Sequence, residues 1–175
     1  MTTDVWGVLV PTGTDVSVRF ERRYPTTPED LWASMTEPAR LSRWLGPVYG
    51  ELRVGGRYEL RMGEDVAGSP QNAVGDVLEC DAPRRLVVGW SFPGEDESRV
   101  SVTIRPDGDG SVLVLEHLGL SESAARGYGA GWHASLGQLD DHTAGRPVRP
   151  WQEIFEAALP HYRSSNPGQP TVASL

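Results

Sequence analysis

The segment GYGAGWHASLGQLDDH, residues 127–142, decides the fold, because it combines a helical pattern with residues that weaken helices. Glycine occupies four of its positions, and each interior glycine costs ~1 kcal/mol relative to alanine. Its apolar side chains nevertheless recur at helical spacing, at Tyr128, Trp132, Leu136 and Leu139. We therefore predict a long helix with a low-profile surface. Such a helix lies close to a curled sheet or leaves volume beside it, and its larger apolar side chains anchor it there.

The residues before this helix show the pattern of strands. Residues 16–24, VSVRFERRY, alternate apolar and polar side chains, which is typical of a half-buried strand. Residues 48–120 contain one strand-like run after another. The turn signals between these runs are Gly55-Gly56, Ala82-Pro83 and the segment 106–110. Consecutive strands joined by short turns predict an antiparallel meander.

Helix signals complete the element order. Pro28 and Pro38 each begin a short helix after the first strand, and Ser121 is placed to cap the long helix. Residues 150–162, PWQEIFEAALPHY, predict a further amphipathic helix that ends at Pro160. The fold class is therefore α+β, with a curved antiparallel sheet wrapped around a long C-terminal helix.

The composition of the chain excludes several classes of protein. The chain has 175 residues, a net charge of -8, sixteen arginines without lysine, and one cysteine, Cys80. The acidic balance and the lack of a basic stripe argue against nucleic acid as a partner. A single cysteine excludes an internal disulfide. No apolar run approaches the ~18 residues of a membrane span, and the start of the chain lacks the features of a signal peptide, so we expect a cytoplasmic protein without a membrane partner.

The chain divides into one domain with short flanking segments. We expect an N-terminal lead-in over residues 1–15, the main domain over 16–145, the amphipathic helix over 146–162 and a disordered tail over 163–175. The stripe of Trp151, Ile154 and Phe155 is predicted to pack on its own domain or on a second subunit, which would make a homodimer.

Several short motifs, in a fixed order, resemble a known superfamily. They are Trp32, Thr36-Glu37-Pro38, Leu41, Trp44-Leu45-Gly46-Pro47, Val54-Gly55-Gly56-Arg57-Tyr58, Gly75-Asp76-Val77-Leu78-Glu79, Pro83-Arg84-Arg85-Leu86, Trp90 and Gly131-Trp132 with Leu136 and Leu139. Together they resemble the SRPBCC superfamily, which includes START domains and birch-pollen-allergen-like proteins. The subgroup they resemble most is named after the activator of the heat-shock-protein-90 ATPase, and the resemblance covers about residues 16–145.

The resemblance implies a helix-grip fold, in which the sheet curls round the long C-terminal helix. It also implies a cavity for hydrophobic small molecules, although fold alone does not fix one activity. Relatives often carry a histidine at the position of His117, on the inward side of its strand. That histidine could hydrogen-bond a ligand, act as acid or base, or be a core residue satisfied by its neighbours.

Aromatic and apolar residues on the inward faces are the other candidates for ligand contact. The side chains expected to line a cavity are Trp44, Tyr58, Leu60, Met62, Trp90, Leu115, His117, Trp132 and Leu136. On the long helix, His133 lies ~100° from Trp132 and is expected at the margin of the interface. Asp140, Asp141 and His142 are expected to form a solvated helix end. Neither a metal-ligand spacing nor a phosphate loop is present, so we expect no metal and no cofactor.

Three functions remain open on these residues. The first is binding of a hydrophobic or aromatic small molecule between sheet and helix, without a catalytic centre. The second is a cyclase- or hydrolase-type enzyme acting on such a ligand, with His117 as acid or base and Glu79 or Glu116 assisting. The third is contact with a chaperone through the outer face of the sheet.

Overall fold

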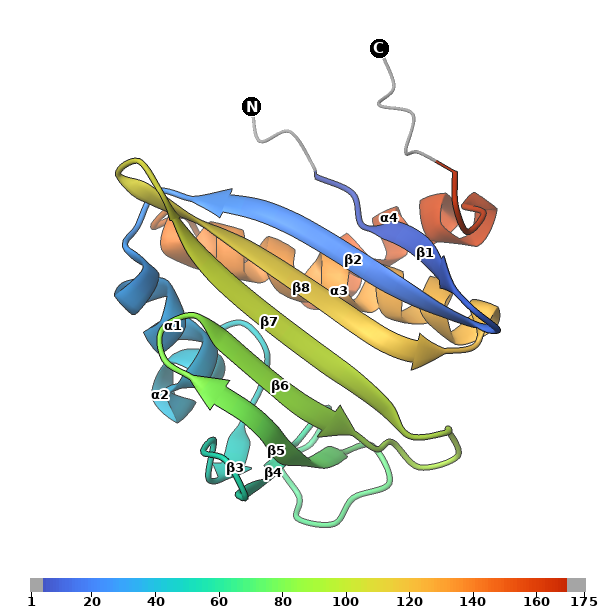
Figure 1. Cartoon of the computed structure of the whole chain (residues 1–175), viewed down its shortest axis with the longest axis horizontal. Helices are drawn as coiled ribbons and strands as arrows, with labels where there is room; N and C mark the ends of the chain where they lie inside the picture. Colours follow the sequence, from blue (N-terminus) through green and yellow to red (C-terminus); the bar gives the residue numbers. More distant parts are fainter. Residues whose placement is uncertain (1–4, 170–175) are drawn as a thin grey trace.

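A computed structural model describes residues 5–169 and shows an eight-stranded antiparallel sheet packed on a long helix (Figure 1). The strand order is β1-β2-β8-β7-β6-β5-β4-β3, so all strands from β3 to β8 follow one another as a meander. The bounds are β1 Val8–Thr12, β2 Asp15–Tyr24, β3 Val48–Gly50, β4 Arg57–Leu60, β5 Ala73–Asp81, β6 Arg85–Trp90, β7 Ser98–Asp107 and β8 Gly110–Leu120. The predicted α+β fold and meander are confirmed.

Four helices accompany the sheet within the described range: α1 Pro28–Thr36, α2 Pro38–Leu41, α3 Glu122–Thr143 and α4 Trp151–Ser164. The short helices begin at the two prolines, as the sequence predicts. Ser121 caps α3, since its hydroxyl accepts a hydrogen bond from the Ala124 N–H at 3.2 Å. None of these helices is long and apolar enough to cross a membrane.

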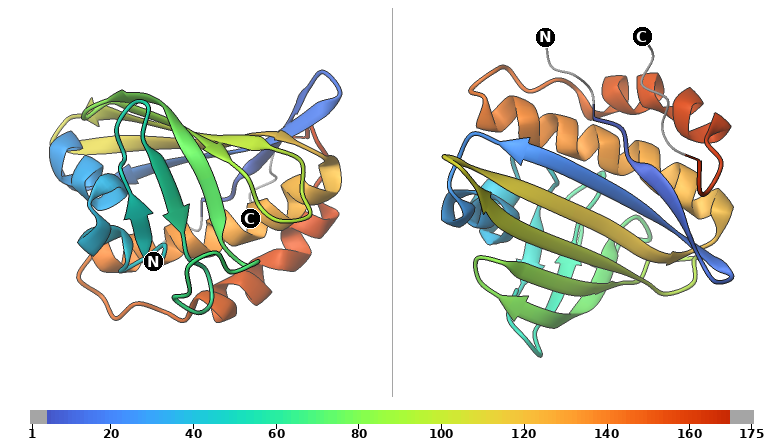
Figure 2. Two further views of the ribbon diagram at one scale, coloured as in Figure 1. Left: turned by 90° about the horizontal axis from the view of Figure 1, so that it is seen from below. Right: turned by 45° about the horizontal axis from the view of Figure 1, so that its top comes forward.

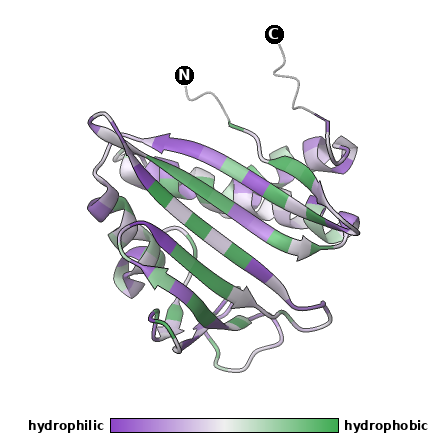
Figure 3. Cartoon of the chain, in the orientation of Figure 1, coloured by the Kyte–Doolittle hydropathy of each residue, from purple (hydrophilic) through white to green (hydrophobic). Residues whose placement is uncertain are grey.

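The sheet curls so that its β3–β4 end and α3 lie on the same side of the molecule (Figure 2). Apolar and polar residues alternate along β7, which gives the sheet one face for the core (Figure 3). His117 lies in the middle of this face, opposite Val18 of β2 and Val100 of β7. The same side of β8 carries the buried residues Leu113 and Leu115. This confirms the inward side predicted for His117.

Two features at the ends of the domain differ from the sequence prediction. Residues 8–12, part of the predicted lead-in, form the edge strand β1. Pro160 does not end α4, which continues to Ser164. The helix persists because Ala158 and Tyr162 are buried in the core on either side of Pro160, and that packing outweighs the missing backbone hydrogen bond. Of the predicted tail, residues 163–164 belong to α4, and residues 170–175 lie outside the described residues.

Two glycines of α3 permit close packing of α4. A Cβ atom at Gly129 would lie 2.5 Å from Cδ1 of Tyr162, and one at Gly137 would lie 3.2 Å from Cδ1 of Ile154. No side chain larger than hydrogen fits at Gly129 without a shift of Tyr162. At these two positions, the glycine content of α3 is explained by the neighbouring helix.

Candidate functional site

Four aromatic side chains meet where the sheet faces the first half of α3. They are Trp90 of β6, His117 of β8, and Tyr128 and Trp132 of α3. Trp90 lies edge-on to His117 with ring centroids 5.4 Å apart, and the centroids of Trp90 and Trp132 are 5.6 Å apart. The rings of His117 and Tyr128 approach to 4.2 Å. We call these four residues the aromatic cluster.

His117 is held inside this cluster by hydrogen bonds at both ring nitrogens. The indole N–H of Trp132 donates to Nδ1 at 3.0 Å, and Nε2 lies 2.8 Å from the hydroxyl oxygen of Ser98. Since Nδ1 accepts, the hydrogen of the neutral ring resides on Nε2 and is donated to Ser98. Burial lowers the pKa of His117 from 6.5 to about 3, so its ring is neutral at physiological pH.

Tyr128 links the cluster to the loop after β6. Its hydroxyl accepts a hydrogen bond from the Trp90 indole N–H at 2.9 Å and donates one to the carboxylate of Glu95. Burial raises the pKa of Tyr128, and the neighbouring Glu95 carboxylate raises it further. Tyr128 is therefore a neutral donor that fixes the position of Glu95.

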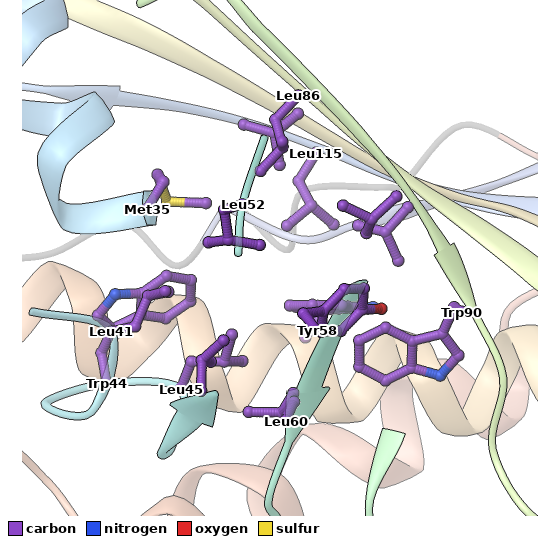
Figure 4. A pocket seen from close by; sticks show the side chains of 15 residues that line it. Met35, Leu41, Trp44, Leu45, Leu52, Tyr58, Leu60, Leu86, Trp90 and Leu115 are labelled. Carbon is purple, nitrogen blue, oxygen red and sulfur yellow. The ribbon is translucent and has the colours of Figure 1, made fainter. Parts of the chain in front are cut away.

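A small cavity lies behind the cluster, between the sheet and α1–α2 (Figure 4). Its volume is about 70 Å³. Its lining is Met35, Leu41, Trp44, Leu45, Val48, Leu52, Tyr58, Leu60, Leu86, Val88, Trp90, Val100, Val102, Leu115 and Trp132. The polar tips of its aromatic residues are already used, since the Trp44 indole donates to Ser34 O at 2.9 Å and the Tyr58 hydroxyl to Gly89 O at 2.7 Å. The cavity therefore presents an almost entirely apolar lining.

A much larger groove opens in front of the cluster and has a volume of about 830 Å³. Helices α3 and α4 form one side, and the segments flanking β3, β4 and β6 form the other. Its lining is Leu45, Gly46, Pro47, Arg61, Met62, Gly63, Trp90, Phe92, Glu95, Ala124, Gly127, Tyr128, Gly131, Trp132, Ser135, Gln138, Trp151 and Phe155. Leu45, Trp90 and Trp132 line both spaces and so form the boundary between them. We call this larger space the groove.

The remaining two glycines of α3 shape the floor of the groove. A Cβ atom at Gly127 would have no neighbour within 4 Å, and one at Gly131 would meet only Cζ2 of Trp151, at 3.8 Å. These glycines therefore face open space, unlike Gly129 and Gly137. One helix uses glycine on one side for close packing and on another side to leave volume.

Comparison with known proteins identifies the family. Residues 25–144 match the family described as activator of Hsp90 ATPase homolog 1-like protein. The chain belongs to this AHSA1-like family. The resemblance expected from the sequence motifs is thereby confirmed. No curated protein matches the chain.

Solved structures of similar proteins agree with this assignment. The crystal structure of CalU16 from Micromonospora echinospora is 30% identical with a TM-score of 0.73, covering 91% of this chain and 94% of that protein. The protein encoded by gene BPP1335 from Bordetella parapertussis is 29% identical with a TM-score of 0.70, covering 95% of this chain and 96% of that protein. DynU16, from the dynemicin biosynthetic locus, shares the fold at 22% identity with a TM-score of 0.66, covering 77% of this chain and 49% of that protein.

The AHSA1-like fold separates the predicted ligand-contact residues into four groups. Trp44, Tyr58, Leu60 and Leu115 line the small cavity, and Met62 lines the groove. Trp90 and Trp132 line both. His117 and Leu136 are fully buried and line neither space. The prediction of one pocket therefore corresponds to two spaces that meet at the two tryptophans.

Sequence reasoning missed several residues of the groove, namely Glu95, Gly127, Tyr128, Gly131, Trp151 and Phe155. Gly127 and Gly131 are four residues apart, and Ser135 follows after four more, so all three lie on one face of α3. That spacing of small residues was a usable signal. The groove residues from α4, Trp151 and Phe155, had no comparable signal in the sequence, because no pattern tells which side of α3 this helix covers.

The residues suggested to assist His117 do not lie near it. Glu116 is next to His117 on β8 and points to the opposite face of the sheet, where it lies 4.0 Å from Arg19. Glu79 pairs with Arg85 at 2.7 Å. Because both nitrogens of His117 have partners, acid-base chemistry there would first require one of these hydrogen bonds to break.

The predictions for the second half of α3 are wrong in two respects. His133 is buried, 3% exposed, and its Nδ1 lies 3.1 Å from the Tyr162 hydroxyl oxygen. Asp141 is also buried and accepts hydrogen bonds from Arg146 and Arg149, so this helix end is not simply solvated. Both corrections have the same cause, which is that α4 and the segment leading to it cover this side of α3. Across the described range, no three His, Cys, Asp or Glu side chains are arranged to hold a metal ion.

Proposed function

We propose that this AHSA1-like protein binds a hydrophobic or aromatic small molecule in the groove between α3, α4 and the β3–β4 end of the sheet. The observation that carries the proposal is the volume and lining of this space. About 830 Å³ falls within the roughly 300–1,000 Å³ of sites that hold small organic ligands. Its walls are mainly aromatic and aliphatic, with a few polar groups that can orient a ligand.

The small cavity is an unsuitable site by the same criterion. Its volume of about 70 Å³ is less than half of the roughly 150 Å³ cavity that accommodates benzene. Trp90 and Trp132 lie between this cavity and the groove, and their indole N–H groups are both engaged in hydrogen bonds. The ligand is therefore proposed to bind in the groove, on the side of Trp90 and Trp132 that faces away from the small cavity.

Apolar contact supplies the binding free energy in this proposal. Removal of apolar surface from water contributes about 25 cal/mol per Å², and the groove presents indole and phenyl groups from three separate elements: Trp90 of β6, Trp132 of α3 and Phe155 of α4. Two of these groups are immobilised before any ligand arrives. Trp132 bonds to His117, and Trp90 bonds to Tyr128. A preformed wall lowers the entropic cost of ordering side chains on binding.

The test is a titration with the neutral probe 1-naphthaleneethanol, followed by isothermal calorimetry and tryptophan fluorescence. The variant Gly127→Leu places a side chain into the groove, where a Cβ atom has no neighbour within 4 Å. Ser123→Leu is the matched control, because it adds the same side chain one turn earlier on the exposed surface of α3, outside the groove lining.

We expect saturable binding to the unmodified protein and to Ser123→Leu, and at least about tenfold weaker binding to Gly127→Leu. Absence of binding to the unmodified protein would overturn the proposal. So would equal affinity for the two leucine variants, because the probe would then bind elsewhere.

A further inference from the structure

The charged side chains at the groove are unequally compensated. Among the described residues that line it, the charged ones are Arg61 and Glu95. Arg61 is fully engaged: its Nε lies 2.6 Å from Glu59 and its Nη1 lies 2.9 Å from Asp65. Its guanidinium also stacks on the Tyr49 ring at 3.7 Å. The positive charge of Arg61 is therefore already balanced by two carboxylates.

Glu95 has no such compensation. Its side chain is exposed, and the interaction shown for its carboxylate is the hydrogen bond from the neutral Tyr128 hydroxyl to Oε2. Within residues 5–169, no arginine or histidine lies within 4.0 Å of its carboxylate oxygens. The same loop also carries the exposed residues Asp96 and Glu97. This end of the groove is therefore negative.

Aromatic rings surround the place where this charge meets the groove. Trp90 and Tyr128 are in edge contact with ring centroids 6.0 Å apart, and Phe92 also lines this end. Aromatic faces attract cations through their quadrupole, and a carboxylate held in place by Tyr128 adds a direct charge. Aromatic rings and a fixed carboxylate together are the chemistry that recognises an organic ammonium group.

We propose that the groove selects organic cations, namely apolar or aromatic molecules with a protonated amine, and that the amine lies beside Glu95. This inference rests on the proposed function, since it specifies the ligand class of the same groove. The net charge of -8 favours the approach of a cation to the protein as a whole. An anionic ligand is disfavoured, because the groove's single lining arginine among the described residues is already paired with two acids.

Three probes with the same aromatic ring test this selection. They are 2-(1-naphthyl)ethylamine, which is a cation at pH 7, the neutral 1-naphthaleneethanol and the anion 1-naphthaleneacetate. Each is titrated into the unmodified protein, into Glu95→Gln and into Asp96→Asn. The glutamine keeps an acceptor for the Tyr128 hydroxyl while it removes the charge. Asp96→Asn is the matched control, since it removes a charge from the same loop at a residue outside the groove lining.

We expect the amine to bind more tightly than the alcohol, on the order of three- to tenfold at low salt, and the acetate to bind most weakly. Glu95→Gln is expected to abolish the preference for the amine and to leave the affinity for the alcohol unchanged. Asp96→Asn is expected to keep the preference, and added salt is expected to reduce it.

The outcomes separate the two proposals. Binding of the alcohol without preference for the amine would overturn the selection of cations and leave the proposed function intact. A preference that persists in Glu95→Gln would overturn the role of Glu95. Failure of both the alcohol and the amine to bind would overturn the proposed function together with this inference.

Discussion

The indole nitrogen of Trp132 donates a hydrogen bond to Nδ1 of His117 across 3.0 Å, and this bond joins α3 to the centre of the sheet. Both side chains are buried, so neither polar atom has water as an alternative partner. The bond explains why a histidine is stable in an apolar core. It also fixes one wall of the groove.

Removal of this donor is expected to destabilise the protein. Trp132→Phe leaves Nδ1 of His117 buried without a partner, which costs about 1–3 kcal/mol in addition to the lost packing. Urea-induced unfolding measures the change. Trp151→Phe is the control, because it removes the same indole donor, here bonded to Ser135, from a side chain that is itself 37% exposed. Equal losses in the two variants would contradict the role assigned to the buried bond.

The buried histidines predict a dependence of stability on pH. Burial lowers the folded-state pKa of both His117 and His133 to about 3, from 6.5. Between these values the unfolded chain binds protons that the folded protein does not, so stability falls as pH decreases from about 7 towards 5. Each histidine contributes up to about 1.4 kcal/mol per pH unit in this range.

This prediction is checked by urea unfolding at several pH values between 5 and 7. His117→Gln and His133→Gln are each expected to flatten the slope, and the double variant is expected to flatten it further. An unchanged slope in both single variants would show that neither histidine is the source.

The two kinds of glycine in α3 predict opposite effects of the same substitution. Gly127→Ala is expected to stabilise the protein by up to about 1 kcal/mol, because alanine favours the helix and its Cβ has open space. Gly129→Ala is expected to destabilise it by about 1–3 kcal/mol, because the Cβ would press on the Tyr162 ring. Thermal unfolding compares the two variants directly. A stabilising effect at Gly129 would contradict the observed packing of α4.

A buried ion pair links β2 to the end of α3. Arg22 Nη1 lies 2.6 Å from Asp140 Oδ2, and the arginine side chain is 6% exposed. Asp140→Asn would leave a buried guanidinium without its charge partner, so we expect a loss of about 3 kcal/mol. The comparison is Asp76→Asn, which removes the exposed partner of Arg57 and is expected to cost less than about 1 kcal/mol. Urea unfolding measures the free energy of unfolding of both variants. Similar decreases in the two would contradict the claim that burial makes the Arg22–Asp140 pair more important for stability than the exposed pair.

Much of the fold follows from local signals in the sequence. Thr27, Pro28 and Pro38 set the starts of the short helices, and Ser121 caps α3, because such cap and turn residues act within a few positions of the chain. Strand β1 was missed because it is short and contains Pro11, which is tolerated on an edge strand. The continuation of α4 past Pro160 was missed because tertiary packing, and not local preference, sustains it.

The site was less predictable than the fold. Trp90 and Trp132 were identified because large aromatic residues on an inward face must border either a core or a pocket. The sequence pattern does not tell how tightly the side chains behind them pack, so a single pocket was expected where the structure has a small cavity and a separate groove. Glu95 lies on a polar loop, and its contact with Tyr128 joins residues 33 positions apart. The homodimer and the chaperone contact remain predictions.

The most direct test of the central claim is a crystal structure of the protein with 1-naphthaleneethanol bound. We predict that the naphthalene ring lies over Gly127 and Gly131 of α3, against Trp90 and Phe155, with the small cavity behind Trp132 unchanged. A ring inside the small cavity, or one bound to the outer face of the sheet, would contradict the assignment of the groove as the binding site.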